Sequence, residues 1–406
     1  MKDGRTQQRK IRTHHYIHGL LICIATASHT AHSLTVAVFG GSGFIGRRVC
    51  RTLVQSDKCD AVISISKSGK PPSYYCSDVD VNNKDGTRWS DVVQWKSFDL
   101  DKDWKGDNGD KHEQIMEQQL ELPPIDAAIS CIGNVQPRRE WKQLFGLSFD
   151  DERLFYENGI LNQRAINLAK RAGAKRFAFV SVGYETAKCL EGPIEGYIYG
   201  KRAAESSAVN AFGEERTVFV GPSSFVFGGK RFPAFGGVYR ALVESAPARA
   251  YVAGNDFLRN LSVAPLEDWL EKMVFSSPVE VDRVARVLCA GCLGLVDRDR
   301  VGPRRQGFYD QEGKAVVYPD ALCVDGTFEI EQVDDLVYPS LGIQRKLSAT
   351  AAAATEPVDL KEGGEPPFEG ALIGKRPYLY PFPVIVLFAT IFWSIATQQF
   401  VQVSPQ

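Results

Sequence analysis

The chain has 406 residues, of which 44% are hydrophobic and 24% charged, so it holds enough apolar material for a folded core and is not a disordered or fibrous protein. Its length predicts about two or three domains. The net charge of -1 argues against the strongly basic class of nucleic-acid-binding proteins. All histidines but His112 precede residue 33, which disfavours a Ser-His-Asp hydrolase in its usual chain order and a histidine-rich metal site.

The first 33 residues are predicted to form a targeting segment. Residues 1–18 carry five basic residues and a single acid, Asp3, and the apolar stretch 19–27 follows. A basic start before a short apolar stretch is typical of a secretory signal, whereas basic residues with few acids are also typical of an organelle presequence. Both interpretations stay open at this point, as does cleavage of the segment.

A glycine-rich turn follows the first predicted strand. The stretch 34–39 is short, apolar and β-branched, as in a buried strand, and helical spacing begins soon after it. A dinucleotide pyrophosphate requires such a strand–turn–helix, because the backbone must come close and the helix N-terminus must point its N–H groups at the phosphates. We therefore predict a dinucleotide site, with Phe44 and Ile45 packing the helix on the sheet. The residues of the turn are Gly40, Gly41, Ser42, Gly43, Phe44, Ile45 and Gly46.

The chain then alternates between strand and helix patterns. This alternation predicts an α/β fold with a doubly wound parallel (Rossmann) sheet over residues 34–221. Residues 222–345 are expected to form a smaller C-terminal substrate or cap region, in which the lone pair Cys289 and Cys292 predicts burial in a helix rather than a metal site. Further strands are expected at 61–66, 92–98, 125–130, 176–181 and 217–220, helices near 151–172 and 197–210, and insertions at 70–92 and 101–122.

The end of the second predicted strand indicates which nicotinamide dinucleotide is bound. A site that prefers NAD(H) places a carboxylate there for the ribose 2′-hydroxyl, whereas this strand ends at Ser66 and is followed by Lys67. A cation beside the ribose suits a 2′-phosphate, so NADP(H) is the predicted cofactor and NAD(H) the less favoured one. The alternative is that Lys67 and Lys70 belong to a solvated loop.

The C-terminal end has the pattern of a tethered membrane helix. Residues 346–376 include a low-complexity stretch and are expected to form a flexible linker. Residues 377–406 contain no charged side chain, and 378–397 matches the ~20 residues that a bilayer requires. Aromatic residues lie in or near this stretch, and Lys375 and Arg376 precede it. We therefore expect a membrane anchor, with a buried or dimer-forming helix as the alternative.

Several motifs resemble those of the short-chain dehydrogenase/reductase superfamily, in its extended and atypical branches. The resemblance covers roughly residues 34–300. Within the superfamily, the chain is most similar to the nucleotide-binding accessory subunit of respiratory complex I and to the related proteins of coenzyme Q synthesis, with plastid proteins as a third group. The motifs are the glycine spacing of 40–46, the stretches 158–162 and 172–181, the run Tyr197-Ile-Tyr-Gly-Lys201 with its Ala204-Glu205 tail, and the segments 222–228 and 278–285.

The resemblance implies further cofactor and catalytic residues. Asp99 is similar to the acid that reaches the adenine amino group, and the stretch from Ser130 to Gly133 lies where the chain passes the cofactor ribose. In the superfamily a Tyr acts as the base, a Lys four residues later lowers the Tyr pKa and holds the nicotinamide ribose, and a Ser or Thr positions the carbonyl. The residues that match these three roles are Tyr197, Lys201 and Ser181.

Two departures from the superfamily's motifs leave open whether the chain is catalytically active. Gly221 stands where the superfamily has an arginine, and the gap of 16 residues between Ser181 and Tyr197 fits neither common branch. The pair Tyr184 and Lys188 also has the four-residue spacing. Three functions are therefore retained: a nucleotide-binding accessory or assembly protein in the respiratory or quinone pathway, an NADPH-dependent oxidoreductase acting on a quinone-like or carbonyl substrate, and a nucleotide-sugar epimerase or dehydratase.

The two ends together favour an organelle membrane. A secretory signal would place Lys375 and Arg376 on the translocated side of the final helix, against the positive-inside rule. A presequence that delivers the body to a matrix or stroma avoids this conflict. The predicted location is the mitochondrial inner membrane, with a plastid and then the endoplasmic reticulum as alternatives. The predicted partners are a dinucleotide, the membrane and a respiratory or quinone-synthesis complex, but no nucleic acid.

Overall fold

The protein is described here by a computed structural model, which covers residues 34–71, 88–101, 120, 122–134, 150–190, 194–222, 226–228, 233–260, 275–296, 318 and 320–343. The predicted targeting segment 1–33, the linker 346–376 and the membrane anchor 377–406 lie outside these residues. Within the described residues, no helix combines the length and the apolar character that crossing a bilayer requires.

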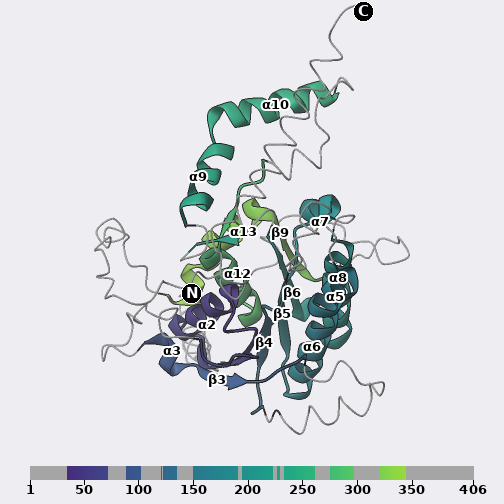
Figure 1. The fold of residues 1–406 in the computed structure, drawn as a ribbon. Helices are drawn as coiled ribbons and strands as arrows, with labels where there is room; N and C mark the ends of the chain where they lie inside the picture. Colours follow the sequence, from purple (N-terminus) through teal and green to yellow (C-terminus); the bar gives the residue numbers. More distant parts are fainter. Residues whose placement is uncertain are drawn as a thin grey trace, which may run out of the picture.

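A seven-stranded sheet of the described residues organises the fold (Figure 1). Its strands are β1 (Leu34–Phe39), β2 (Cys59–Ser66), β3 (Gln94–Ser97), β4 (Ala127–Ser130), β5 (Arg176–Val180), β6 (Thr217–Gly221) and β9 (Leu322–Asp325). They lie in the order β3-β2-β1-β4-β5-β6-β9, and every neighbouring pair is parallel. This is the strand order of a Rossmann fold with one further strand, so the predicted α/β class with a doubly wound parallel sheet is confirmed.

Some strands differ from their predicted bounds. β2 begins two residues early because Cys59 already pairs with Leu34 of β1. The third strand is shorter than predicted because Val92 belongs to the short helix α3 (Trp89–Val92), which buries the Trp89 side chain. β9 is absent from the predicted strands, yet it pairs with β6 in the main sheet. The sheet therefore also draws on the region beyond residue 221.

Alternate residues of the strands face two helical layers. Val36 and Val38 of β1 belong to the core shared with α2 (Phe44–Gln55), α12 (Val281–Leu293) and α13 (Gly326–Val337). Ala37 and Phe39 belong to the core shared with α6 (Leu161–Arg171) and α8 (Glu195–Phe212). Figure 1 shows these two sets of helices on opposite sides of the strands. Burial on both faces explains why the strand sequences are continuously apolar rather than alternating.

The predicted burial of the C-x-x-C pair is confirmed. Cys289 and Cys292 are both fully buried in α12. Their thiols donate weak hydrogen bonds to backbone carbonyls, Cys289 to Val49 at 3.7 Å and Cys292 to Ala128 at 3.5 Å. The two cysteines therefore help to pack α12 against α2 and β4.

The predicted helix 151–172 contains an interruption. α5 (Asp151–Phe155) and α6 are joined by a π-helical turn, Tyr156–Ile160. This turn lies close against α8, since a Cβ added to Gly159 would stand 3.0 Å from the Cα of Gly200. π-Helical turns frequently occur at functional sites, and this one contains Asn158, which bonds the segment that leaves β4.

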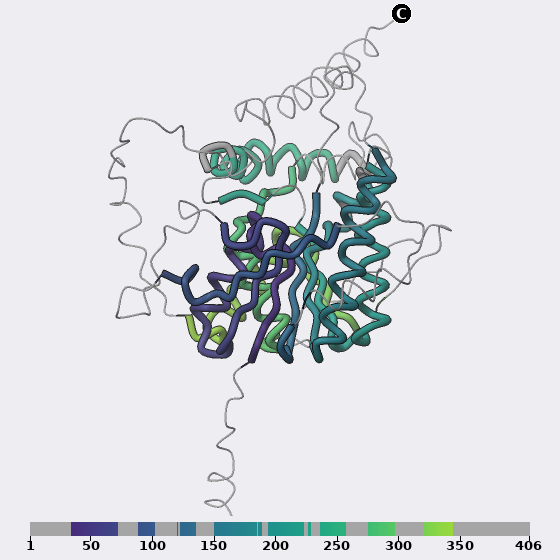
Figure 2. Tube along the Cα trace, turned by 60° about the horizontal axis from the view of Figure 1, so that its bottom comes forward, coloured from purple at the N-terminus to yellow at the C-terminus, as the bar shows by residue number. Residues whose placement is uncertain are grey.

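Two helices stand off from the sheet (Figure 1, Figure 2). They are α9 (Pro233–Val243) and α10 (Ala246–Asn260). Nearby, the short strands β7 (Val226–Phe227) and β8 (Val279–Glu280) form a separate parallel pair. Gly236 packs α9 on β7, because a Cβ there would overlap the Phe227 ring. The chain beyond β6 thus leaves the sheet layer, forms this pair of helices and returns through α12.

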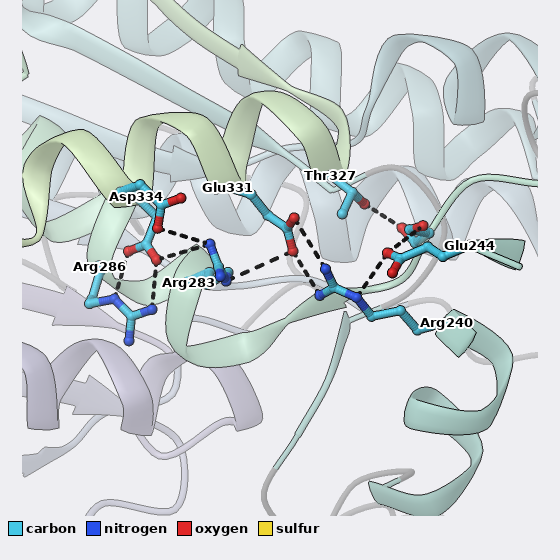
Figure 3. A network of polar contacts seen from close by, with 9 residues as sticks. Arg240, Glu244, Arg283, Arg286, Thr327, Glu331 and Asp334 are labelled. Atoms are coloured by element: carbon cyan, nitrogen blue, oxygen red, sulfur yellow. Dashed lines mark hydrogen bonds and ion pairs between the residues drawn. The ribbon is translucent and has the colours of Figure 1, made fainter. Parts of the chain in front are cut away.

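A network of charged side chains ties α9 to α12 and α13 (Figure 3). Arg240 of α9 lies 2.7 Å from Glu331 of α13. Arg286 of α12 makes two bonds to Asp334 of α13, at 2.6 and 2.7 Å. Arg283 lies between these pairs, 3.8 Å from Glu331 and 3.5 Å from Asp334. The bidentate Arg286–Asp334 pair is the most buried part of the network, because the Asp334 side chain is only 3% exposed.

We expect Asp334→Asn to lower the free energy of unfolding by about 2–3 kcal/mol, because it leaves the Arg286 guanidinium without its anion in a partly buried position. Urea denaturation measures the change. Asp335→Asn is the matched control, since that side chain is 70% exposed and its removal should cost less than about 1 kcal/mol. Equal losses in the two variants would contradict the role given to Asp334.

Candidate functional site

The chain changes direction across the sheet at the carboxyl ends of β1 and β4. From β1 it continues to β2 and β3 on one side, and it then returns to form β4 on the other side of β1. Ligands of open α/β sheets bind in the crevice outside such a point. The glycine turn after β1 and the segment 131–134 after β4 meet at this location.

The glycine turn packs directly on the backbone that leaves β4. Gly40 has a φ of +75°, in the left-handed region that favours glycine, and a Cβ there would lie 3.2 Å from the carbonyl carbon of Cys131. A Cβ on Gly46 would overlap the Gly40 carbonyl, and a Cβ on Gly41 would overlap the Ser64 hydroxyl. The close packing of the turn, the strand exit and the start of α2 therefore requires glycines.

The first turn of α2 carries no competing anion. Gly43 is the N-cap, and within the described residues the helix start has neither a side-chain cap nor an acidic residue in its first turn. The N–H groups and the helix dipole make this end electropositive. Ile45 packs against the core as predicted, and Phe44 is partly buried. The Ser42 hydroxyl lies beside the turn, 2.8 Å from the Ser68 hydroxyl.

The predicted ribose and adenine residues pair with one another. Lys67 Nζ lies 2.8 Å from Asp99 Oδ2 and 3.9 Å from Asp101 Oδ2, and the hydrogen bond to Asp99 raises the pKa of Lys67. Ser66 is buried, and its hydroxyl donates to the Gly69 carbonyl at 3.2 Å. The sequence analysis assigns Lys67 to the ribose 2′-phosphate and Asp99 to the adenine amino group, as two separate contacts with the ligand. Because β2 and β3 are neighbours, their carboxyl ends bring the two charges together.

Lys201 lies at the carboxyl ends of β4 and β5, where it is 2% exposed. Its Nζ donates to the Ile132 carbonyl at 3.0 Å and to the Val180 carbonyl at 2.9 Å, and it stands 4.6 Å from the centre of the Phe179 ring. A Cβ on Gly133 would lie 2.8 Å from this Nζ, so the predicted residues Gly133 and Lys201 do meet. Burial lowers the pKa of Lys201 to about 7, because the ammonium loses its hydration.

Tyr197 precedes Lys201 by one turn of α8, and its ring centre is 5.8 Å from Lys201 Nζ. The resemblance implies that the ammonium lowers the pKa of this phenol, and that role stays a prediction. Desolvation raises the pKa of Tyr197 to about 12. The N–H groups of Lys201 are directed at two carbonyls, and burial lowers the pKa of Lys201 to about 7. The phenol is therefore protonated at neutral pH, where it can donate a proton but is a poor base.

The hydroxyl of Ser181 is directed at a carboxyl group on α8. Ser181 Oγ donates to Glu205 Oε1, and the Glu205 side chain is fully buried. Burial raises the pKa of Glu205 to about 8. Tyr197, Lys201 and Glu205 follow one another at intervals of four residues, so they share one face of α8. That spacing, together with the Ala204-Glu205 tail of the motif, is the signal that could have identified Glu205.

Two buried asparagines hold the segment that leaves β4. Asn158 Oδ1 accepts from the Asn134 N–H at 3.0 Å, and its amide donates to the Asn134 carbonyl at 2.8 Å. Asn162 Oδ1 accepts the Ser130 hydroxyl at 2.5 Å, so the predicted residue Ser130 is turned toward α6. Their four-residue spacing in one helix is the sequence signal for both. These bonds fix the backbone opposite the glycine turn.

The second Tyr-x-x-x-Lys pair lies on α7 (Tyr184–Leu190). The Tyr184 backbone N–H donates to Asp325 Oδ1 at 2.8 Å, beside the end of β9. Lys188 is exposed. Lys201, in contrast, is buried against the ends of β4 and β5, so the pair on α8 is the one at the crevice.

Comparisons with known proteins give partial matches. No family model matches the chain. An uncharacterized chloroplastic protein of Arabidopsis thaliana is 25% identical over 251 residues, which cover 62% of this chain and 68% of that protein. MIOREX complex component 2 of Saccharomyces cerevisiae is 40% identical over 63 residues, which cover 16% of this chain and 20% of that protein.

Solved structures match at low identity. A UDP-Glc/GlcNAc 4-epimerase from Campylobacter jejuni matches with a TM-score of 0.40 and 12% identity, over 77% of this chain and 85% of that chain. An oxidoreductase from Lactococcus lactis matches with a TM-score of 0.30 and 14% identity, over 48% of this chain and 71% of that chain. At such scores, the Rossmann fold of this chain rests on its own strand order.

The buried position of Lys201 makes stability depend on pH. The folded-state pKa of about 7 lies below the ordinary value of 10.5, so between these values the unfolded chain binds a proton that the folded chain has released. Stability should therefore rise with pH through this window, by at most about 1.4 kcal/mol per pH unit. Lys201→Met should remove this rise between about pH 8 and pH 10 in urea denaturation.

Lys188→Met is the matched control, because it removes an exposed lysine from a pair with the same spacing. Its pH dependence should follow that of the native protein. Parallel curves for the native protein and Lys201→Met would contradict the lowered pKa of Lys201 in the folded chain.

Proposed function

We propose that this chain binds a nicotinamide dinucleotide in the crevice between the carboxyl ends of β1 and β4. The observation that carries the proposal is the glycine turn 40–46, which lies against the exit of β4 and opens on a helix start without an acidic first turn. A pyrophosphate fits this donor set, because it is bound mainly by backbone N–H groups and needs close approach to the backbone. Side chains at Gly40 or Gly46 would press on the backbone of the turn and of the β4 exit, so the packing that forms this site would be lost.

The surrounding residues support one orientation of the dinucleotide. Lys67 and Asp99 stand at the ends of β2 and β3, and Ser42 of the glycine turn is bonded to Ser68, next to Lys67. These polar groups suit the adenosine ribose. Lys201 and Tyr197 stand at the ends of β4 and β5, which suits the nicotinamide ribose. The pyrophosphate then spans the start of α2, between these two groups.

NADP(H) is the dinucleotide that we favour. The Lys67 side chain is 71% exposed, so its ammonium is open to solvent although it pairs with Asp99. A 2′-phosphate would compete with Asp99 for the Lys67 ammonium. The free energy gained from pairing Lys67 with the phosphate is reduced by the loss of its pairing with Asp99. The preference over NAD(H) should therefore be modest.

Carbonyl reduction is the second candidate function, and the protonation of Tyr197 favours it. A bound nicotinamide would supply the hydride. The chain must then give a proton to the carbonyl oxygen, and a phenol with a pKa of about 12 holds that proton at neutral pH. Lys201, one helical turn away, adds a group that exchanges its proton near pH 7.

We propose that the protein works in an organelle, at the mitochondrial inner membrane, as a nucleotide-binding accessory or assembly protein of the respiratory or quinone pathway. The basic segment 1–18 and the uncharged segment 377–406 support this location. So do the relatives, one described as chloroplastic and one named as a component of a complex. Carbonate extraction of isolated organelles tests it: release of the full-length protein into the soluble fraction would refute the membrane anchor.

We expect Gly43→Val to abolish nucleotide binding, because the branched side chain would stand where the backbone must approach the pyrophosphate. Isothermal titration with NADPH and with NADH measures the loss. In the native protein NADPH should bind more tightly, and equal affinities would contradict the role given to Lys67.

Gly237→Val is the matched control for this experiment. A Cβ at Gly237 meets nothing within 4 Å, and this glycine lies on the exposed side of α9. The control should bind as the native protein does, with both variants checked for folding by circular dichroism. Unchanged affinity in Gly43→Val would refute the proposed site.

We expect Tyr197→Phe to reduce carbonyl reduction by at least about 100-fold while nucleotide affinity is kept, because only the proton donor is removed. The rate of NADPH oxidation with quinone-like and carbonyl substrates is the measurement. Tyr184→Phe is the control and should retain activity. Loss of activity in Tyr184→Phe alone would assign the chemistry to the pair on α7.

A further inference from the structure

A buried carboxyl group lies behind the proposed reaction site, on the same face of α8 as Tyr197 and Lys201. Glu205 is fully buried, and its Oε1 accepts the Ser181 hydroxyl. Its Oε2 is buried too and has no hydrogen-bond partner among the described residues. An ionised carboxylate with one bonded and one unbonded oxygen is costly in such a place, so the geometry favours the protonated form.

The charged neighbours of Glu205 come from several elements. Lys201 and Arg202 of α8 favour its ionised form, and so does the Ser181 hydroxyl at the end of β5. Asp325 at the end of β9 disfavours it, and Tyr318, before β9, is also close enough to interact electrostatically. Burial outweighs the favourable contacts and raises the pKa of Glu205 from 4.5 to about 8.

We propose that Glu205 is a positioning residue whose protonation sets the direction of the Ser181 hydroxyl. A serine hydroxyl has one proton to donate and two lone pairs that accept. An ionised Glu205 can only accept, so it takes that one proton from the site. A protonated Glu205 can instead donate to Ser181 Oγ, which leaves the serine proton free for an oxygen atom of a bound ligand.

This inference rests on the proposed function in one respect, namely that the ligand lies within reach of Ser181. Its pH dependence follows directly. Below the pKa of about 8 the carboxyl is protonated and the serine proton is available. As the pH rises through that value the carboxyl ionises, and the ability of Ser181 to donate to a ligand is lost.

Infrared difference spectroscopy tests the protonation step without any nucleotide. The C=O stretch of a protonated carboxyl should be present below pH 8 and disappear above it, and it should be missing at every pH in Glu205→Gln. Glu195→Gln is the matched control on the same helix, since Glu195 is exposed, and it should keep the titrating band.

Ser181→Ala tests the coupling between the two residues. The serine donates to the ionised carboxylate and so stabilises it, and its removal should raise the midpoint of the band by about one pH unit or more. A glutamate that stays ionised would give no titrating band near pH 8, and one that is not coupled to Ser181 would keep its midpoint in Ser181→Ala. Absence of the band, or an unchanged midpoint in Ser181→Ala, overturns the inference.

Kinetics separate this inference from the proposed function. If carbonyl reduction is observed, its rate should decline tenfold per pH unit above the midpoint, and Glu205→Gln should lack this decline because its amide stays neutral. A decline that persists in Glu205→Gln overturns the inference. Failure of the native protein to bind any nicotinamide dinucleotide refutes the proposed function, whereas the infrared result still decides the coupling of Glu205 and Ser181.

Discussion

Close backbone packing where the chain leaves β1 and β4 is the constraint on which the rest of the site depends. The turn after β1 can lie against Cys131 only because Gly40 has no side chain, and α2 can start against the turn only because Gly46 has none. This contact places the start of α2 beside the exit of β4. Asn158 holds that exit from the opposite side through two bonds to the Asn134 backbone. The backbone on both sides of the proposed site is therefore held by contacts within the fold, so a ligand would find it already in place.

Burial of charge on α8 is the second constraint, and it differs from the ion pairs elsewhere in the fold. Arg286 and Asp334 are bonded to each other directly, so each charge is compensated. Lys201 and Glu205 instead contact carbonyl and hydroxyl groups, and their pKa values move toward neutrality, to about 7 and about 8. Groups that titrate in this range, at the carboxyl edge of a parallel sheet, are typical of functional sites rather than of structural pairs.

Local sequence patterns were sufficient to predict most strands of the sheet, but not all of them. The strand at 34–39 was predicted with its correct bounds, because a strand buried on both faces is a short, uninterrupted apolar run. β9 was not predicted, since a strand of four residues carries little periodic signal and its pairing with β6 is a long-range contact. The π-helical turn at 156–160 was also missed. Its packing against Gly200 of α8 involves a residue about forty positions away.

In the candidate site, too, features formed by adjacent residues could be predicted and features formed by long-range contacts could not. The glycine turn is recognisable from seven consecutive residues, because its geometry depends on a strand, a tight turn and a helix start that adjoin one another in the chain. The ion pair of Lys67 with Asp99 and the bond of Ser181 to Glu205 depend instead on which strands and helices become neighbours. Burial then shifts the pKa values of Tyr197 and Lys201 in directions that residue type and spacing do not reveal, because the loss of hydration is a property of the folded chain.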